Sequence, residues 1–94
     1  MSAIVRISDV NSGGGVVTST PQSNFHTNGL LVAVVGAKGT GHPPCQDETI
    51  HCSGVWETQT TQTTFHVSGK LAIMVGDVDT CDHSRVNGSE NFFI

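Results

Sequence analysis

Histidine and cysteine side chains gather in the sequence at spacings that suit a bound metal ion. The chain contains five histidines and three cysteines, and six of these eight residues lie in two short segments, 42–52 and 81–83. They are His42, Cys45, His51, Cys52, Cys81 and His83. Zn²⁺ takes four nitrogen or sulfur ligands tetrahedrally in closed structural sites. We therefore predict a metal site, and the alternative is that the thiols are small buried hydrophobes and the imidazoles polar loop groups.

The stretch VVGAKGTGHPPC, residues 34–45, comes close to a phosphate-binding loop. Gly36 and Gly41 have the required G-x-x-x-x-G spacing. His42 and Pro43 stand where a lysine and a hydroxyl residue should hold the phosphates and Mg²⁺, so this interpretation fails. We instead interpret the glycines as a sharp turn that carries His42 to a metal. The two prolines then stiffen the exit, because each fixes φ and lacks an N–H.

Other side chains with chemical potential are expected to have structural roles. His26 and His66 each follow a phenylalanine, and strand alternation should point them away from it, so we do not assign them to the metal. Trp56 is expected in the core or an interface. Three carboxylates should accept hydrogen bonds within turns rather than act as acids or bases: Asp9, Asp77 and Asp79. No serine–histidine–acid arrangement can be placed, and we predict that the chain is not an enzyme.

Length and composition limit the remaining function classes. Ninety-four residues indicate one domain spanning 1–94. The net charge is −4 with four lysines and arginines, so there is no basic patch to bind nucleic acid. No apolar run approaches the roughly 20 residues of a membrane-spanning helix. The N-terminal MSAIVRISD lacks the features of a signal peptide, which predicts synthesis in the cytoplasm.

The elements that must position the metal ligands are predicted to be strands. LLVAVVG (30–36) and LAIMVG (71–76) are short apolar runs that end in glycine, and their valine and isoleucine content favours buried strands. Residues 55–67 alternate in a way that suits a half-exposed strand or a pair of strands. We expect an all-β fold with no helix longer than about two turns.

An internal repeat organises these strands. NFHTNGLLVAVVGAKGTGH (24–42) matches TFHVSGKLAIMVGDVDTCDH (64–83) in the order F-H-x-x-G, apolar strand, V-G and a loop that ends in histidine. Residues 5–15 match the later part of this unit, and residues 88–94 match its beginning. The unit is thus used about three times and is circularly offset, so that the first copy, at the N-terminus, lacks its start, which is found at the C-terminal end of the chain. Three such units sharing one core predict a pseudo-threefold body whose loops cluster at one end.

The repeat and its loops resemble the PAAR-repeat proteins, which cap the spikes of contractile injection machines. LAIMVGD (71–77) and LLVAVVGA (30–37) carry the repeated strand, and IHCSGVW followed by DVDTCDH is similar to a variant found in phage tail spikes. The likeness covers nearly the whole chain. It implies a small cone closed by a metal at its apex, with its base seated on a trimeric β-helical spike, one copy per trimer.

Members of that family typically hold one zinc with three histidines and one cysteine. Carried over to this sequence, the resemblance implies one Zn²⁺ per chain and a ligand set of His42, His51, Cys81 and His83. Cys45 or Cys52 could replace one of these. Two departures are visible: the first loop reads SGGG where many members have a histidine, and LAIMV replaces the proline-alanine-alanine-arginine string.

The implied role is a sharp tip that helps pierce a target membrane during a transient contact. Its place would be a phage tail or the spike of a bacterial type VI secretion system, and the sequence does not decide between them. Two other functions stay open. A small zinc-dependent enzyme would need an exchangeable water on its metal, and a metal-free interaction module would have free thiols. The phenylalanines at 25, 65 and 92 could form the spike-binding face or simply belong to the core.

Overall fold

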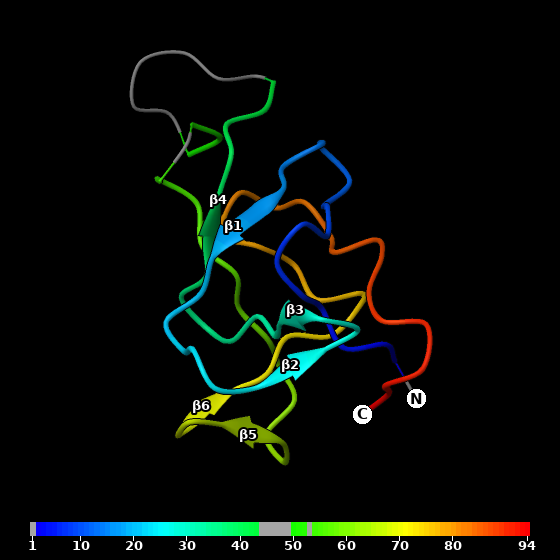
Figure 1. Ribbon diagram of the computed structural model, residues 1–94. Helices are drawn as coiled ribbons and strands as arrows, with labels where there is room; N and C mark the ends of the chain where they lie inside the picture. Colours follow the sequence, from blue (N-terminus) through cyan, green and yellow to red (C-terminus); the bar gives the residue numbers. More distant parts are fainter. Residues whose placement is uncertain (1, 44–49, 53) are drawn as a thin grey trace.

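The computed structural model describes residues 2–43, 50–52 and 54–94. Within these ranges the chain forms six short strands and no helix. They are β1 (Val17–Ser19), β2 (His26–Thr27), β3 (Leu30–Leu31), β4 (Lys38–Gly39), β5 (His66–Val67) and β6 (Lys70–Leu71). Three antiparallel pairs result, β1–β4, β2–β3 and β5–β6 (Figure 1). The predicted all-β fold is confirmed, although the strands are much shorter than the apolar runs 30–36 and 71–76.

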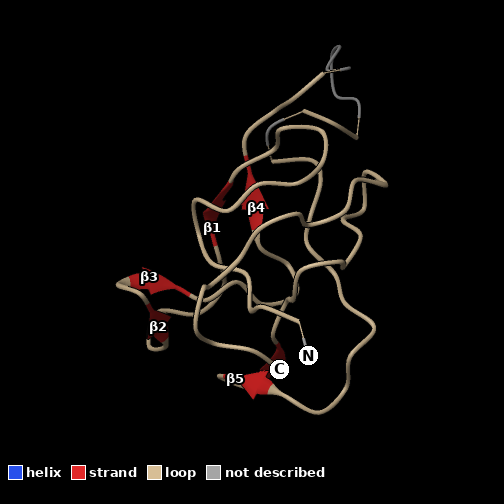
Figure 2. Ribbon diagram, turned by 90° about the vertical axis from the view of Figure 1, so that its right-hand side faces the viewer, coloured by secondary structure: helices blue, strands red, loops and turns tan. Residues whose placement is uncertain are grey.

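Two tight hairpins and the paired chain ends occupy one end of the molecule. The β2–β3 hairpin turns at Asn28-Gly29, and β5–β6 turns at Ser68-Gly69, with positive φ at both central residues of each turn. This is the two-residue turn that fits twisted antiparallel strands. In place of a third hairpin, the amide of Ser2 donates to the carbonyl of Ile94 at 3.0 Å, and the reverse bond is 2.9 Å. The two termini lie side by side in Figures 1 and 2, so the first copy of the repeat is completed in space by the end of the chain.

A closed ring of backbone hydrogen bonds joins the three copies. Val5 N–H donates to the carbonyl of Ile73 at 2.9 Å, Ile73 donates to Ala33 at 3.0 Å, and Ala33 donates back to Val5 at 2.9 Å. The donors of a second ring lie two residues further along each copy than the donors of the first ring. Its bonds run from Ile7 to Leu31, from Val35 to Leu71 and from Val75 to Ala3, at 2.8–2.9 Å. Within one ring each copy donates to one neighbour and accepts from the other, and the second ring runs in the opposite direction. Each copy is therefore bonded to both neighbours, which is the pattern expected of a pseudo-threefold body.

The side chains at the rings divide between two apolar clusters because neighbouring strand residues point in opposite directions. Val5, Ala33 and Ile73 are fully buried and pack with Trp56 and Cys81, so this cluster reaches the predicted metal ligands. Their preceding neighbours pack on the other side, against the repeated phenylalanines. This second cluster contains Ile4, Val32, Val34, Val67 and Ala72, with Phe25, Phe65 and Phe92 partly buried beside it.

The repeated phenylalanines form a triad of aromatic rings near the hairpin end. The ring centroids lie 6.0 Å apart for Phe25 and Phe65, 5.5 Å for Phe25 and Phe92, and 5.7 Å for Phe65 and Phe92. Two of these contacts are edge-on, a favourable geometry for aromatic pairs. The triad is therefore part of the packing, while its incomplete burial leaves some aromatic surface accessible.

The predicted strand over residues 55–67 is wrong for most of its length, since only β5 is formed there and residues 55 and 56 belong to a loop. The reason is that a glutamine side chain takes the backbone bonds that a neighbouring strand would make. Gln62 Oε1 accepts from the amides of Thr64 and Phe65, while its Nε2 donates to the carbonyls of Phe65 and Ala72, all at 2.9–3.0 Å. Gln22 makes the equivalent four bonds in the earlier copy.

The glycine-rich segment 36–42 also differs from the simple loop that the sequence predicts. Gly36 has a φ of 92° and provides the expected turn. The next residues then form β4, which pairs with β1. A Cβ on Gly39 would lie 1.9 Å from the carbonyl oxygen of Val16, so glycine is required there by the close approach of two backbones.

Candidate metal centre

Loops from two repeat copies bring the predicted ligands to the end of the molecule away from the hairpins. His42 follows β4 by three residues, on the chain that rises toward the upper end in Figure 1. The amide of His42 donates to the carbonyl of His51 at 3.0 Å, which fixes the two histidines beside each other. Cys81 lies in a tight loop in which the amide of Asp79 donates to the carbonyl of His83 at 2.9 Å. All four predicted ligands are thus held by backbone hydrogen bonds near their own positions.

His42, His51 and Cys81 form a cluster that could hold a metal ion. Their ligand atoms all lie within 4.8 Å of one another. Cys81 Sγ is 3.6 Å from His42 Nε2, and both side chains are buried. Zinc–nitrogen and zinc–sulfur bonds of about 2.0–2.3 Å at tetrahedral angles give a ligand separation of roughly 3.6 Å. The thiol and this imidazole therefore already have the spacing of two ligands on one ion.

His83 lies beside this cluster. Its ring centroid is 4.8 Å from that of His42 and 5.1 Å from that of His51. Its Nε2 is buried without a hydrogen-bond partner among the described residues, and so is Nδ1 of His51. A buried polar atom without a partner carries a free-energy penalty of about 1–3 kcal/mol. A metal ion placed between the rings would satisfy both nitrogens, so the donor set fits a bound cation.

The tautomer of His42 suits metal binding. Its Nδ1 lies 3.1 Å from the carbonyl oxygen of Pro43, a group that can only accept, so Nδ1 carries the proton. Nε2 then has a free lone pair on the side of Cys81. Metal-bound histidines almost always donate their other ring N–H in this way.

Burial shifts the ionisation of two of the ligands. Loss of solvent raises the pKa of the Cys81 thiol and, together with the neighbouring His42 and His83, lowers the pKa of His51. Both shifts favour the uncharged side chain when no cation is present. A bound metal ion would favour the thiolate of Cys81, and its binding would release the thiol proton.

The three cysteines differ in whether they can supply a sulfur ligand. Cys81 is a free cysteine. Cys52 is disulfide-bonded, so it has no thiolate to offer in this structure. Cys45 lies outside the described residues. Cys81 is therefore the sulfur ligand that the described part of the chain supports.

The histidines that were not assigned to the metal lie elsewhere. His26 and His66 are exposed on β2 and β5, the strands of the hairpin end. Neither belongs to the metal-binding cluster. Their exclusion from the predicted ligand set is consistent with this placement.

Two of the three carboxylates behave as turn residues, and the third does not. Asp9 accepts from the amide of Arg6 at 2.8 Å, and Asp77 accepts from the amide of Met74 at the same distance. Asp79 instead forms a fully buried ion pair with Arg85, with 3.0 Å between Oδ2 and the guanidinium nitrogen. The prediction of a turn role for Asp79 is therefore wrong, because its loop folds inward over the core.

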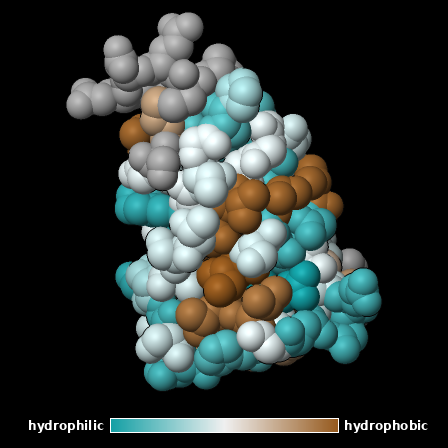
Figure 3. Space-filling model, turned by 45° about the horizontal axis from the view of Figure 1, so that its top comes forward, coloured by the Kyte–Doolittle hydropathy of each residue, from teal (hydrophilic) through white to brown (hydrophobic). Residues whose placement is uncertain are grey.

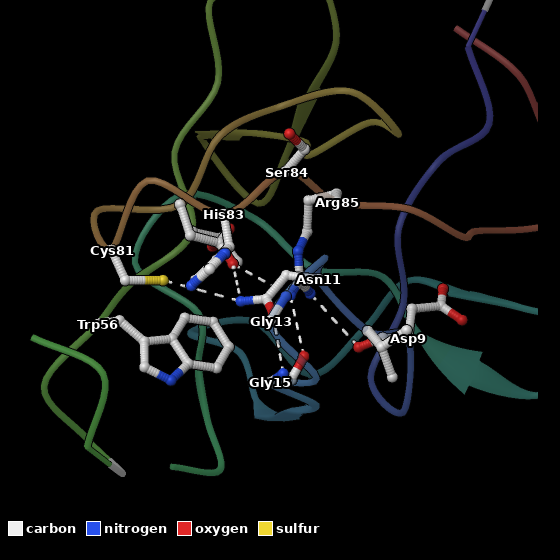
Figure 4. Close-up of polar contacts among 12 residues, drawn as sticks. Asp9, Asn11, Gly13, Gly15, Trp56, Cys81, His83, Ser84 and Arg85 are labelled. Atoms are coloured by element: carbon white, nitrogen blue, oxygen red, sulfur yellow. Dashed lines mark hydrogen bonds and ion pairs between the residues drawn. The ribbon is translucent and has the colours of Figure 1, made fainter. Parts of the chain in front are cut away.

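Arg85 is a buried residue that no feature of its sequence neighbourhood singles out. Its guanidinium lies 5.4 Å from the ring of Trp56 and donates to the carbonyls of Asp9 and Gly15 at 3.3 and 3.1 Å. Figure 4 shows this arginine between the first-copy loop and the loop of Cys81. With Asp79 it fastens two of the three ligand-end loops to each other.

The glycines of the first-copy loop make room for the imidazoles. A Cβ on Gly13 would lie 2.8 Å from ring atoms of both His42 and His83, and one on Gly15 would lie 2.7 Å from His42. Contacts this short require the neighbouring group to shift. The SGGG sequence, which departs from the resembled family, therefore brings a bare backbone against the histidines.

No protein-family model and no curated protein matches the chain. Among the described residues, no helix is long and apolar enough to cross a membrane.

Proposed function

We propose that this chain is a rigid, zinc-closed tip that caps a trimeric β-helical spike of a contractile injection machine. The observation that carries the proposal is the closed ring of hydrogen bonds through Val5, Ala33 and Ile73. One chain with three near-equivalent copies can present a similar edge to each subunit of a trimer. Single-chain pseudosymmetry is what a cap needs to end a threefold object with one molecule.

Zinc is the metal that the donor set favours. Imidazole suits several transition metals, and a thiolate shifts the preference toward Zn²⁺ in a tetrahedral nitrogen and sulfur site. We assign His42, His51, Cys81 and His83 as its four ligands. Bound zinc would join loops from two copies and stabilise a chain whose strands are only two or three residues long.

Four protein ligands leave no position for a reactive water, so the metal serves a structural role. This distinguishes the proposal from a zinc-dependent enzyme. A tip closed in this way would resist deformation when the spike is driven against a target membrane, with which it makes only transient contact.

The spike would bind at the hairpin end, opposite the metal centre. The aromatic triad of Phe25, Phe65 and Phe92 offers apolar surface there, and Phe93 is 44% exposed nearby in sequence. On the face shown in Figure 3, polar residues separate the hydrophobic surface into patches, whereas the three phenylalanine rings of the triad adjoin one another. Three equivalent aromatic positions on a single chain match a trimer that presents the same surface three times.

Native mass spectrometry of the purified chain mixed with trimeric β-helical spike fragments tests the proposal. We expect a complex of one chain per spike trimer, either with a phage tail spike or with a type VI secretion spike. Replacing Phe65 by Ala should weaken this complex, whereas replacing His26, which is exposed on the same end, should not. A three-to-three complex, or no complex with spikes of either source, would contradict the cap.

A further inference from the structure

The loop of the first repeat copy supplies no metal ligand, yet it contacts two of the proposed ligands through side-chain polar atoms. Ser12 Oγ lies 3.2 Å from Nδ1 of His83. Asn11 Nδ2 lies 3.8 Å from Sγ of Cys81. Both ligands belong to the loop of another copy, about seventy residues away in the chain. We propose that Asn11 and Ser12 are positioning residues that orient and tune the metal ligands. This inference rests on the metal centre proposed above.

The hydrogen bonds around Ser12 place its hydroxyl beside Nδ1 of His83, where it suits the metal-binding tautomer of the ring. Ser12 Oγ accepts from the amide of Ser84 at 3.3 Å, and the amide of Ser12 donates to the carbonyl of Ser84 at 2.8 Å. The hydroxyl oxygen is thus fixed in place and can accept a second bond from Nδ1–H of His83. When Nε2 binds the metal, the proton lies on Nδ1, and its bond to Ser12 Oγ fixes the orientation of the ring.

Asn11 uses every hydrogen-bonding position of its side chain. Its Oδ1 accepts from the amides of Gly13 and Gly15 at 3.0 and 2.8 Å, which fixes the orientation of the amide group. Its Nδ2 therefore faces the other way, where it donates to Asp79 Oδ2 at 3.0 Å and points one N–H toward the sulfur of Cys81. Figure 4 shows this fan of contacts. A donor beside the sulfur stabilises a thiolate, and the same residue shapes the glycine loop that covers the imidazoles.

Each repeat copy thus has a distinct task at the metal end. The second copy, with its inserted segment, provides His42 and His51, and the third provides Cys81 and His83. The first provides Asn11 and Ser12. The absence of a histidine from its loop is explained by this division, because the loop backbone and these two side chains occupy the space beside the rings.

The test compares the unaltered full-length chain with Ser12→Ala, Ser12→Thr and Ser23→Ala. Ser12 is exposed, so its replacement leaves the core intact, and Ser23 is an exposed serine near the hairpin end that serves as the matched control. Zn²⁺ affinity is measured by competition with a chromophoric chelator. We expect Ser12→Ala to weaken binding by about 10–100-fold, the usual effect of losing an outer partner of a ligand. Ser12→Thr keeps a hydroxyl and should bind almost as tightly as the unaltered chain, as should Ser23→Ala.

Substitution with Co²⁺ gives a readout that a purely structural role would not change. Ser12→Ala should alter the visible ligand-field bands and leave the sulfur-to-cobalt charge-transfer band near its original energy. Asn11→Asp replaces the donor beside the sulfur by an acceptor, so it should shift the charge-transfer band instead. Near-ultraviolet circular dichroism checks that each variant is folded.

The outcomes separate this inference from the proposed function. If Ser12→Ala binds Zn²⁺ as tightly as Ser23→Ala and its Co²⁺ spectrum is unchanged, the positioning role is overturned while the metal centre stands. An unaltered chain that binds neither Zn²⁺ nor Co²⁺ removes both.

Discussion

Cys81 Sγ and His42 Nε2 lie 3.6 Å apart, although thirty-nine residues separate them in the chain. The two residues come from corresponding loops of two repeat copies, and the rings of backbone hydrogen bonds set the distance between those copies. The geometry of the candidate metal centre is therefore a consequence of the pseudo-threefold core. A change in that core that moved one copy against another would also move one ligand away from the other.

Removal of His83 tests the ligand that lies outside the tightest cluster. We expect His83→Ala to lose most of its bound zinc and at least about 2 kcal/mol of stability, which lowers the Tm of a chain this size by roughly 8–16 °C. His26→Ala, at an exposed histidine on β2, should retain both metal and Tm. Metal analysis and thermal unfolding measure the two effects. A His83→Ala protein with full metal content would exclude this histidine from the ligand set.

Breaking the buried ion pair between Arg85 and Asp79 should reduce stability more than breaking an exposed ion pair. Replacing Arg85 by Met leaves a buried carboxylate without its partner, a change that costs about 3–5 kcal/mol. The chain offers a matched control in Lys38, whose 2.6 Å pair with Glu57 is more than 40% exposed on each side. Lys38→Met should cost no more than about 1 kcal/mol. Urea unfolding compares the two variants. Equal losses of unfolding free energy would show that burial does not increase the contribution of the arginine pair.

Gln62 should be important for stability although it is far from the metal. Its side chain makes four hydrogen bonds to the backbone around Phe65, so Gln62→Ala removes a partner from several backbone groups, most of them partly buried. We expect a loss of about 2–4 kcal/mol in urea unfolding. Gln59 is exposed on the same segment, and its replacement by Ala should change stability by less than about 0.5 kcal/mol. A Gln62→Ala protein as stable as Gln59→Ala would show that water replaces the side chain at no cost.

Residue types and the repeat were sufficient to predict the ligand end of this molecule. Histidine and cysteine in the loops after equivalent strands predicted the approach of His42 and Cys81, whereas the hairpins at Asn28-Gly29 and Ser68-Gly69 were not predicted. The glutamine role was also visible in principle, since a glutamine stands three residues before the repeated phenylalanine in two copies. In the first copy, whose start lies at the C-terminal end of the chain, Ser89 takes this place and accepts from the amide of Phe92 at 3.1 Å.

Other features depend on contacts that no local pattern records. Arg85 occurs in a single copy, and nothing in its neighbourhood marks it as buried. Its burial follows from the inward fold of the Asp79 loop over Trp56. The strand predicted over 55–67 failed for a related reason, because side chains rather than a partner strand satisfy the backbone there. Contacts of this kind between residues far apart in the sequence can be recognised only when the three copies are assembled.

Zinc stoichiometry combined with X-ray absorption at the zinc edge tests the central claim most directly. The account predicts one zinc per chain, surrounded by three nitrogen ligands at about 2.0–2.1 Å and one sulfur at about 2.3 Å. Cys81→Ala should remove the sulfur signal. A protein that holds less than one zinc per chain after purification and reconstitution with zinc would contradict this claim. A zinc coordination shell that contains two sulfurs, or a water oxygen in place of a histidine, would contradict it as well.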